Sequence, residues 1–400
     1  MNDSVLLGNY NRAPINIVRG EGCYLYDDQG QRYLDFIAGI AVCALGHCHP
    51  WISQAIADQA RTLVHCSNLY YHEPSNTLAK ELVARSGFAR AFFCNSGTEA
   101  NEAAIKLARK RAFRKGETDR ITILACTGSF HGRTLGALAA TANDKYKEGF
   151  GPMPAGFAFT EFNDMFALDK AIDDKVAAFI VEPVQGESGV HPATVEFLAM
   201  ARHLCDKRGA LLIFDEIQCG MGRLGPLFAF ERFGVRPDIV TMAKALANGL
   251  PIGAMLVAES AIDALQPGDH GTTFGGSPVP CAAALAHLRV RDAIDLAAYV
   301  AVREVQLMAR LADLALAFPS VISGLRGMGL LCALGLNEKY PVADVVTALR
   351  EHGMLVGSAG GNSLRFAPPL VLGEEQIDEA YETLYEVFSH IDERVSAVVA

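Results

Sequence analysis

The chain has 400 residues, of which 50% are hydrophobic and 20% are charged, with 37 glycines and a net charge of −10. This composition excludes a disordered chain, a collagen and a small disulfide-bonded scaffold, and the length suits two or three domains of ~150 residues each. Because the charge is negative and no basic run is interleaved with aromatic residues, we expect neither nucleic acid nor an anionic membrane as a partner. An anionic substrate would have to be bound by local arginines.

No targeting or membrane-spanning segment is predicted. Residues 1–22 lack a basic region followed by an apolar one, and no stretch approaches the ~18 apolar residues of a membrane span. We therefore expect a cytoplasmic protein. The ten cysteines form no CxxC pair and no regular framework, which favours reduced thiols over disulfides.

The first 50 residues contain a predicted hairpin, with strands at 23–26 and 33–36 around a turn at 27–30. Shortly after it come Cys43, His47, Cys48 and His49, which are zinc-ligating residue types. Zinc sites usually draw a second ligand pair from downstream, and none follows here. A local turn is the favoured interpretation, and we predict no metal site.

Short apolar runs alternate with helical periodicity through the middle of the chain, which is typical of an α/β fold with a largely parallel sheet. Buried strands are predicted at 121–124, 177–181, 211–214 and 239–241, and a helix at 195–208. Beyond about residue 285 the pattern changes to amphipathic helices, at 285–296 and 375–394, with short strands near 330–336 and 363–366. This change predicts a second, smaller α+β domain.

Two residues that follow predicted strands indicate a cofactor. Ligands of open parallel sheets bind beyond the carboxyl ends of the strands, and Asp215 and Lys244 each follow such an end. Alone, Asp215 is equally explained as a helix cap or magnesium ligand, and Lys244 as a snorkelling side chain. Their separation of 29 residues is one βα unit, which brings neighbouring strand ends together. Pyridoxal phosphate requires such a pair, a lysine for covalent attachment and an aspartate at the pyridine nitrogen.

Two further segments suit the same cofactor. Residues 95–102 follow the apolar run 91–94 and lead into a predicted helix at 100–114, so backbone N–H groups with the hydroxyls of Ser96 and Thr98 would bind a phosphate. An ordinary helix cap is the alternative. Phe130, beside glycine, would stack on a cofactor ring, and Arg133 would bind a carboxylate. A core-covering aromatic and a solvated arginine are the alternatives there.

Two more motifs accompany these segments, Glu-Pro-Val-Gln-Gly-Glu at 182–187 and Gly-Thr-Thr-Phe-Gly-Gly at 271–276. In this order, the segments resemble the class-III, fold-type I pyridoxal-phosphate ω-aminotransferases. Within that family the resemblance is to the acetylornithine-specific members. It covers nearly the whole chain, from Arg-Gly-Glu-Gly at 19–22 to Leu-Arg-Phe-Ala-Pro-Pro at 364–369. The implied fold has a large domain at 56–284 around a mainly parallel seven-stranded sheet. A smaller α+β domain is built from both chain ends, 1–55 and 285–400.

The resemblance also implies a role for each matched residue. Lys244 and Asp215 would be the catalytic pair, and Thr273 would reach the phosphate bound by a neighbouring subunit, which implies a homodimer with shared active sites. Pyridoxal 5'-phosphate is the implied cofactor. The residues implied to bind it are Ser96, Gly97, Thr98, Phe130, Asp215, Gln218, Lys244 and Thr273.

Three charged residues are implied to bind the substrates. Arg133 would grip the α-carboxylate of the donor, and Arg365 would bind 2-oxoglutarate. Glu187 would pair with Arg365 in the amine half-reaction and move away when the keto acid arrives. The implied reaction moves the δ-amino group of N2-acetylornithine to 2-oxoglutarate by a ping-pong mechanism, giving N-acetylglutamate 5-semialdehyde and glutamate in arginine biosynthesis.

Several alternatives stay open. The same chemistry would serve succinylornithine, N-succinyl-diaminopimelate, a carrier-bound lysine derivative or ornithine, although Ile40 stands where ornithine enzymes commonly have tyrosine. An aminomutase on this fold would not need the site formed by Glu187 and Arg365. A cofactor-free binding protein would have lost Lys244 or Asp215. Cys219 stands where the family usually has Thr, and Ser277 where it usually has Asn, so substrate preference and cofactor affinity stay open. The sequence also leaves open whether the protein is a tetramer, the physiological direction of the reaction and the role of the cysteines.

Overall fold

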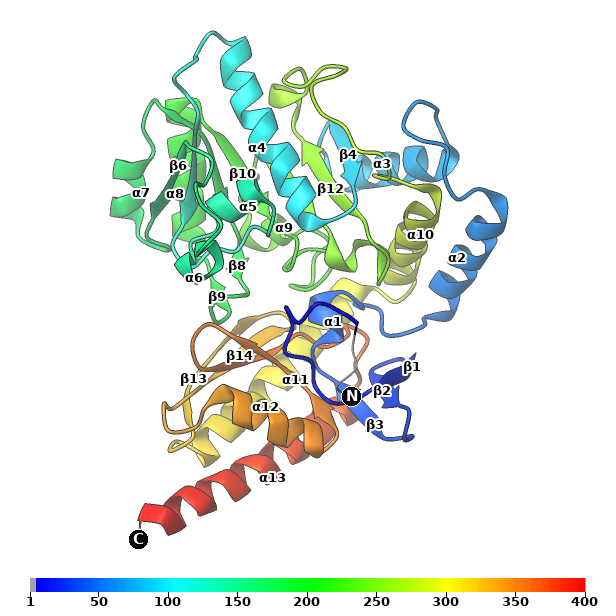
Figure 1. Cartoon of the computed structure of the whole chain (residues 1–400), viewed down its shortest axis with the longest axis vertical. Coiled ribbons are helices and arrows are strands. Elements are labelled where there is room, and N and C mark those ends of the chain that lie inside the picture. The colour runs from blue at the N-terminus through cyan, green and yellow to red at the C-terminus, as the bar shows by residue number, and fades with distance from the viewer. Residues whose placement is uncertain (1–4, 400) are drawn as a thin grey trace.

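The computed structural model of the protein describes residues 5–399, with side chains as far as residue 392. Residues 1–4 and 400, at the ends of the predicted terminal segments, lie outside the described residues. The described chain forms a seven-stranded sheet, two four-stranded sheets and a two-stranded ribbon. The large sheet lies in the upper half of Figure 1, and the sheets that contain the chain ends lie below it.

The seven-stranded sheet has the order β4-β12-β11-β10-β7-β5-β6, and only β12 runs antiparallel to its neighbours. The four adjacent strands β7, β10, β11 and β12 are buried at every position, which is why they appear in the sequence as continuous apolar runs. The predicted sheet is confirmed. Its strands are β4 (Arg90–Cys94), β5 (Thr122–Cys126), β6 (Phe157–Thr160), β7 (Val176–Val181), β10 (Leu211–Asp215), β11 (Ile239–Met242) and β12 (Gly253–Val257).

Helices cover this sheet, and their ends follow local capping chemistry. The Thr194 side chain accepts a hydrogen bond from the N–H of Phe197, and Gly209 ends the same helix in the left-handed region, so the predicted helix at 195–208 is confirmed. A β-ribbon of β8 (Val184–Gln185) and β9 (His191–Pro192) precedes it. The other elements here are α4 (Gly97–Arg114), α5 (Leu135–Ala140), α6 (Asp144–Lys147), α7 (Met165–Ala171), α8 (Val195–Arg208), α9 (Ala229–Phe233), η1 (Lys244–Ala247) and η2 (Glu259–Ala261).

The two ends of the chain meet in one small sheet. The predicted hairpin is present, and its second strand pairs in parallel with β15, so Leu34 lies opposite Met354, 320 positions further along the chain. A second four-stranded sheet has the order β13-β14-β17-β16. The smaller α+β unit built from both chain ends is therefore confirmed. Its strands are β1 (Ile17–Glu21), β2 (Tyr24–Asp27), β3 (Arg32–Asp35), β13 (Ile322–Met328), β14 (Leu331–Leu336), β15 (Met354–Leu355), β16 (Gly357–Ala359) and β17 (Ser363–Phe366).

One predicted helix is wrong in its bounds. The amphipathic pattern at 285–296 belongs to two helices, because Asp295 adopts a left-handed backbone (φ 44°) and its side chain accepts the N–H of Ala298. The helix before this break packs against α2 and α3, whereas the helix after it packs against α13. The remaining helices are α1 (Ala38–Ala41), α2 (Pro50–Thr62), α3 (Glu73–Ser86), α10 (Pro278–Ala293), α11 (Leu296–Ala317), α12 (Val342–Glu351) and α13 (Glu374–Val399). Within residues 5–399, none of the helices has the length and apolar character needed to span a bilayer.

Candidate active site

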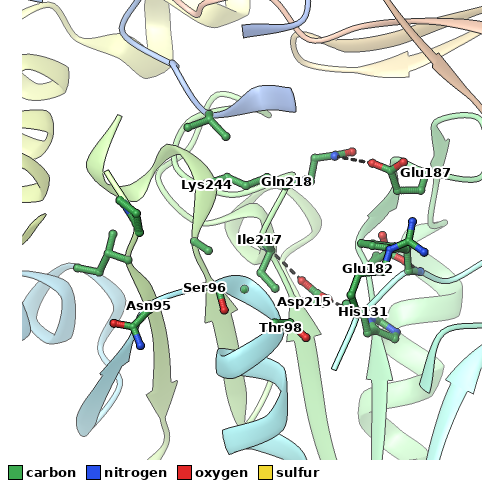
Figure 2. Close-up of a pocket in the computed structure, with 18 of the residues that line it drawn as sticks. Asn95, Ser96, Thr98, His131, Glu182, Glu187, Asp215, Ile217, Gln218 and Lys244 are labelled. Carbon is green, nitrogen blue, oxygen red and sulfur yellow. Dashed lines mark hydrogen bonds and ion pairs between the residues drawn. The ribbon is translucent and has the colours of Figure 1, made fainter. Parts of the chain in front are cut away.

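A cavity of about 420 Å³ lies at the carboxyl ends of β10 and β11. Asp215 is the last residue of β10 and Lys244 begins η1 directly after β11, so the parallel pairing of these strands brings both side chains into one pocket, as predicted (Figure 2). Of the predicted site residues, nine line this cavity: Ser96, Gly97, Thr98, Phe130, Arg133, Glu187, Asp215, Gln218 and Lys244.

Asp215 is held by hydrogen bonds on both carboxylate oxygens. Its Oδ2 accepts bonds from Asn101 Nδ2 and His131 Nδ1, each 2.8 Å long, and its Oδ1 accepts the N–H of Ile217 at 3.1 Å. Asn101 is itself fixed, because Thr241 Oγ1 donates to its Oδ1 at 2.7 Å. Asp215 and the three side chains around it are at least nine-tenths buried. The position of the carboxylate is therefore fixed.

The Lys244 amine faces the same pocket as Asp215. Burial lowers the pKa of Lys244 to about 8, and the positive charge of Arg365 acts in the same direction. The negative charges of Glu187 and Asp215 act the other way but do not cancel the effect of burial. Near neutral pH a fraction of this amine is therefore unprotonated, which is the form that a nucleophile or a general base needs.

The start of α4 forms one end of the cavity. The first intrahelical bond runs from the N–H of Ala100 to the carbonyl of Ser96, so the N–H groups of Gly97 and Thr98 precede the helical ladder. A Cβ on Gly97 would come within 2.8 Å of two Ile217 side-chain carbons, so glycine is required there. The hydroxyl of Ser96 bonds Glu99 and caps the helix. The helix thus starts at 97 and not at the predicted 100.

Phe130 and Arg133 form a separate part of the lining. The Arg133 guanidinium lies over the Tyr146 ring at 4.0 Å and over the Phe130 ring at 5.3 Å from the centroids. Arg133 itself is exposed and forms no ion pair within the described part of the chain. Its charge is therefore supported by two aromatic faces and is open to an anionic ligand.

Glu187 lines the cavity and forms an ion pair with Arg365, a residue of β17 that lies behind it and does not itself line the cavity. Arg365, buried to 95%, donates to Glu187 Oε1 at 2.5 Å and to the carbonyl of Gly186 at 3.1 Å. Burial alone would raise the pKa of Glu187, but the charges of Arg365 and Lys244 outweigh it and the pKa is lowered. Gln218 Nε2 also donates to Glu187 at 3.2 Å, while its buried Oε1 has no partner among the described residues.

Two sequence arguments concern residues that the structure places outside the cavity. Thr273 is exposed on the loop before α10, in a hollow with His65 and Asn68, and contributes nothing to the pocket of its own chain. Ile40 is exposed as well, and the residue of that segment that lines the pocket is Val42. The donor argument from Ile40 therefore has no contact within one chain to support it.

The histidines of the Cys43–His49 segment have structural partners. His47 Nε2 lies 2.7 Å from Asp35 Oδ2, and the His49 side chain accepts the N–H of Trp51 at the start of α2. Burial opposes protonation of His47, but Asp35 and Cys43 outweigh it and raise its pKa to about 10. These contacts fit the local-turn interpretation of the segment.

Three polar residues at the site were not assigned a role from the sequence. Asn101 and His131 hold Asp215, and Glu182 accepts the N–H of Phe130 at 3.0 Å. Burial, together with the charge of Asp215, raises the pKa of Glu182 well above its usual range. The available signal was proximity to the assigned residues, since Asn101 and Glu182 lie within the quoted segments and His131 lies between Phe130 and Arg133. Their contacts depend on the sheet order, which local patterns do not give.

The residues of the cavity fit pyridoxal phosphate. A lysine and a fixed carboxylate face one pocket, a helix start with two N–H groups ahead of its ladder suits a phosphate, and Phe130 offers a ring face. The orphaned Oε1 of Gln218 leaves a polar atom for a ligand to satisfy. The volume lies within the range of small-molecule sites.

Comparison with known proteins agrees with this geometry. Residues 7–388 match the family described as Aminotransferase class-III. The chain is 48% identical over 382 residues to the acetylornithine aminotransferase of Methanocaldococcus jannaschii, covering 96% of this chain and 95% of the relative. It is 46% identical to that of Thermosynechococcus vestitus, covering 97% and 96%.

Solved structures of similar proteins share the whole architecture. The ornithine aminotransferase of Toxoplasma gondii superposes with a TM-score of 0.94 at 34% identity, covering 98% of this chain and 94% of that one. The N-acetylornithine aminotransferase of Stenotrophomonas maltophilia superposes with a TM-score of 0.85 at 37% identity, covering 96% and 98%.

Proposed function

The chain belongs to the class-III aminotransferases and is a pyridoxal-phosphate-dependent enzyme, and we propose that it moves the δ-amino group of N2-acetylornithine to 2-oxoglutarate. The products are N-acetylglutamate 5-semialdehyde and glutamate, and the reaction serves arginine biosynthesis. The observation that carries the proposal is one cavity that is lined by Lys244, by Asp215 and by Glu187, the ion-pair partner of Arg365. The names of the curated relatives support acetylornithine as the donor.

Pyridoxal phosphate, when bound, supplies a ring that accepts electron density from the reacting carbon. Lys244 would hold it covalently and, once released, move the proton at the donor's δ-carbon, a task suited to an amine with a pKa of about 8. Asp215 would keep a proton on the ring nitrogen. The bonds from Asn101 and His131 fix its carboxylate for that role.

The charged residues would divide the two substrates between them. Arg133 would bind the α-carboxylate of the donor and leave its δ-amine directed at the cofactor. Glu187 would neutralise Arg365 while the donor is bound, because a buried unpaired guanidinium is costly. The second carboxylate of 2-oxoglutarate would then displace Glu187 and take its place on Arg365.

Thr273 supports a homodimer as part of the proposal. It lies on an exposed loop away from the cavity of its own chain, beside Phe274, whose side chain is 62% exposed. If a second copy of the chain packed over this loop, Thr273 would lie at the phosphate-binding site of that second copy. A cytoplasmic location is also proposed, in keeping with the absence of a membrane-spanning helix among the described residues.

The test is a matched comparison of kcat/KM for N-acetylornithine, N-succinylornithine, ornithine and 4-aminobutyrate, each with 2-oxoglutarate as acceptor. We expect N-acetylornithine to be the best donor and turnover to require the keto acid. Ornithine as the best donor would refute the donor assignment. Ornithine is the main rival donor, because the structure of an ornithine aminotransferase superposes on this chain with a TM-score of 0.94. Turnover without a keto acid would indicate an aminomutase.

A further inference from the structure

Three metal-ligating side chains meet on the surface far from the catalytic cavity. His352 directly follows α12, and Glu386 and His390 lie four residues apart on α13. Residues at this spacing project from the same face of a helix, and α13 packs against α12 (Figure 1). The three side chains therefore converge. Within the described part of the chain, they are the one group of three or more such residues with mutually close ligand atoms.

We propose that His352, Glu386 and His390 bind a divalent transition-metal ion, with Zn²⁺ as the best match. Their ligand atoms all lie within 4.8 Å of one another, and all three side chains are exposed. Around a tetrahedral zinc ion with bonds of 2.0–2.1 Å, ligand atoms are about 3.4 Å apart. Small rotations of three exposed side chains close that difference.

His352 is already oriented for metal binding. Its Nδ1 lies 2.8 Å from the carbonyl oxygen of Ala348, and because a carbonyl only accepts, Nδ1 must carry the proton. The unprotonated Nε2 is therefore the free ligand atom. Metal-bound histidines usually donate their second N–H in this way, which fixes the tautomer and the ring orientation.

The donor set selects the class of ion. Two imidazoles and one carboxylate suit zinc and its neighbours in the first transition series, whereas Mg²⁺ and Ca²⁺ prefer oxygen ligands throughout. Three protein ligands leave a fourth position for water or an added ligand. A hollow of about 390 Å³ begins beside the site, and its lining includes Asp344 and Glu351 together with Lys339. The chain also carries a net charge of −10, so the surrounding charge favours a cation.

A metal at this place would join α12 to α13. The ion would bind the folded chain in preference to the unfolded one, so it would raise the unfolding temperature without touching the catalytic residues. The proposal is independent of transamination, and the cavity at Lys244 plays no part in it.

The experiment uses the full-length, cofactor-loaded protein, freed of metal with a chelator and titrated with Zn²⁺. We expect one zinc ion per chain, a zinc-dependent rise in Tm, and a loss of affinity of at least about tenfold in His352→Ala and in His390→Ala. Glu386→Gln keeps the shape of the side chain and should also weaken binding. His203→Ala is the matched control, since His203 is an exposed helical histidine on α8.

The variants should unfold at the wild-type temperature when no zinc is present, because all three side chains are exposed. Zinc binding that is absent from the wild type, or equal in wild type and both histidine variants, would overturn the proposal. Comparable protection by Mg²⁺ or Ca²⁺ would overturn the assignment to transition metals. Zinc bound through the ten free cysteines would persist in all the variants and so count against the site.

Discussion

Two carboxylates that line the active-site cavity are held differently. The floor is here defined as Asp215 with the side chains that fix it, Asn101, His131 and Thr241, and the wall as Gln218 and Glu187 with the ion-pair partner Arg365. Every side chain of the floor is at least nine-tenths buried and fixed by hydrogen bonds of 2.7–2.8 Å. In the wall, the Glu187 side chain keeps 26% of its exposure although Arg365 keeps only 6%. The Glu187 side chain is therefore partly open to water, whereas that of Asp215 is closed off from it. The floor is suited to a cofactor that stays, and the wall to substrates that alternate.

The largest effect on activity is expected at Lys244, whose amine interacts with charges of both the floor and the wall. Lys244→Ala removes the amine that would hold the cofactor and move the proton, so kcat should fall by about 10²- to 10⁴-fold. Steady-state turnover of N-acetylornithine measures this. Lys175→Ala, at an exposed lysine, is the control and should be unchanged. Near-normal turnover by the Lys244 variant would rule out its catalytic role.

A smaller effect is expected for the donor's carboxylate. Arg133→Ala removes charge-assisted hydrogen bonds worth about 1.5–3 kcal/mol, so KM for N-acetylornithine should rise roughly 10- to 100-fold. The same variant should leave 4-aminobutyrate nearly unaffected, since that donor has no α-carboxylate. Equal losses with both donors would mean that Arg133 acts on something other than this carboxylate.

The floor can be tested through stability. Asn101→Ala takes a donor from Asp215 and leaves the carbonyl of His131 and the hydroxyl of Thr241 without this partner. The free energy of unfolding should fall by about 1–3 kcal/mol, measured by urea titration. Asn76→Ala, at an exposed asparagine of α3 whose side chain has no hydrogen-bond partner among the described residues, should cost less. If the two variants lost the same stability, the floor would not be the rigid element described above.

Loss of the Glu187–Arg365 ion pair should affect the two half-reactions differently. Glu187→Gln leaves the Arg365 guanidinium without its countercharge, so kcat/KM for the amine donor should fall about tenfold, as for one lost bond to a charged group. The 2-oxoglutarate half-reaction should change far less. Single-turnover measurements separate the two. Equal slowing of both half-reactions would argue against a gate.

The last prediction concerns the pH dependence of stability in the cofactor-free protein. Lys244 has a folded pKa of about 8 against 10.5 for the free side chain, so between these values the unfolded chain binds more protons. Its contribution to stability therefore rises with pH from about 8 to 10.5 and is lost as the pH falls through that window. Urea titrations across this range should show a positive slope that is reduced in Lys244→Met. An identical slope in both proteins would contradict the lowered pKa.

Local patterns predicted much of this molecule. The strands at 177–181, 211–214 and 239–241 and the helix at 195–208 agree with the structure to within a residue, because buried strands and capped helices have local signatures. The prediction at 285–296 was wrong because the left-handed turn at Asp295 interrupts an unbroken amphipathic pattern.

The sequence by itself determined the order of the motifs and the placement of Asp215 and Lys244 at neighbouring strand ends, since one βα unit separates them. The tertiary structure alone decided which distant side chains meet. Asn101 reaches Asp215 across 114 residues and Arg365 reaches Glu187 across 178. It also brought His352 to His390 through the packing of α12 on α13. Such contacts depend on strand order, helix packing and burial, and these are properties of the assembled fold that no local pattern contains.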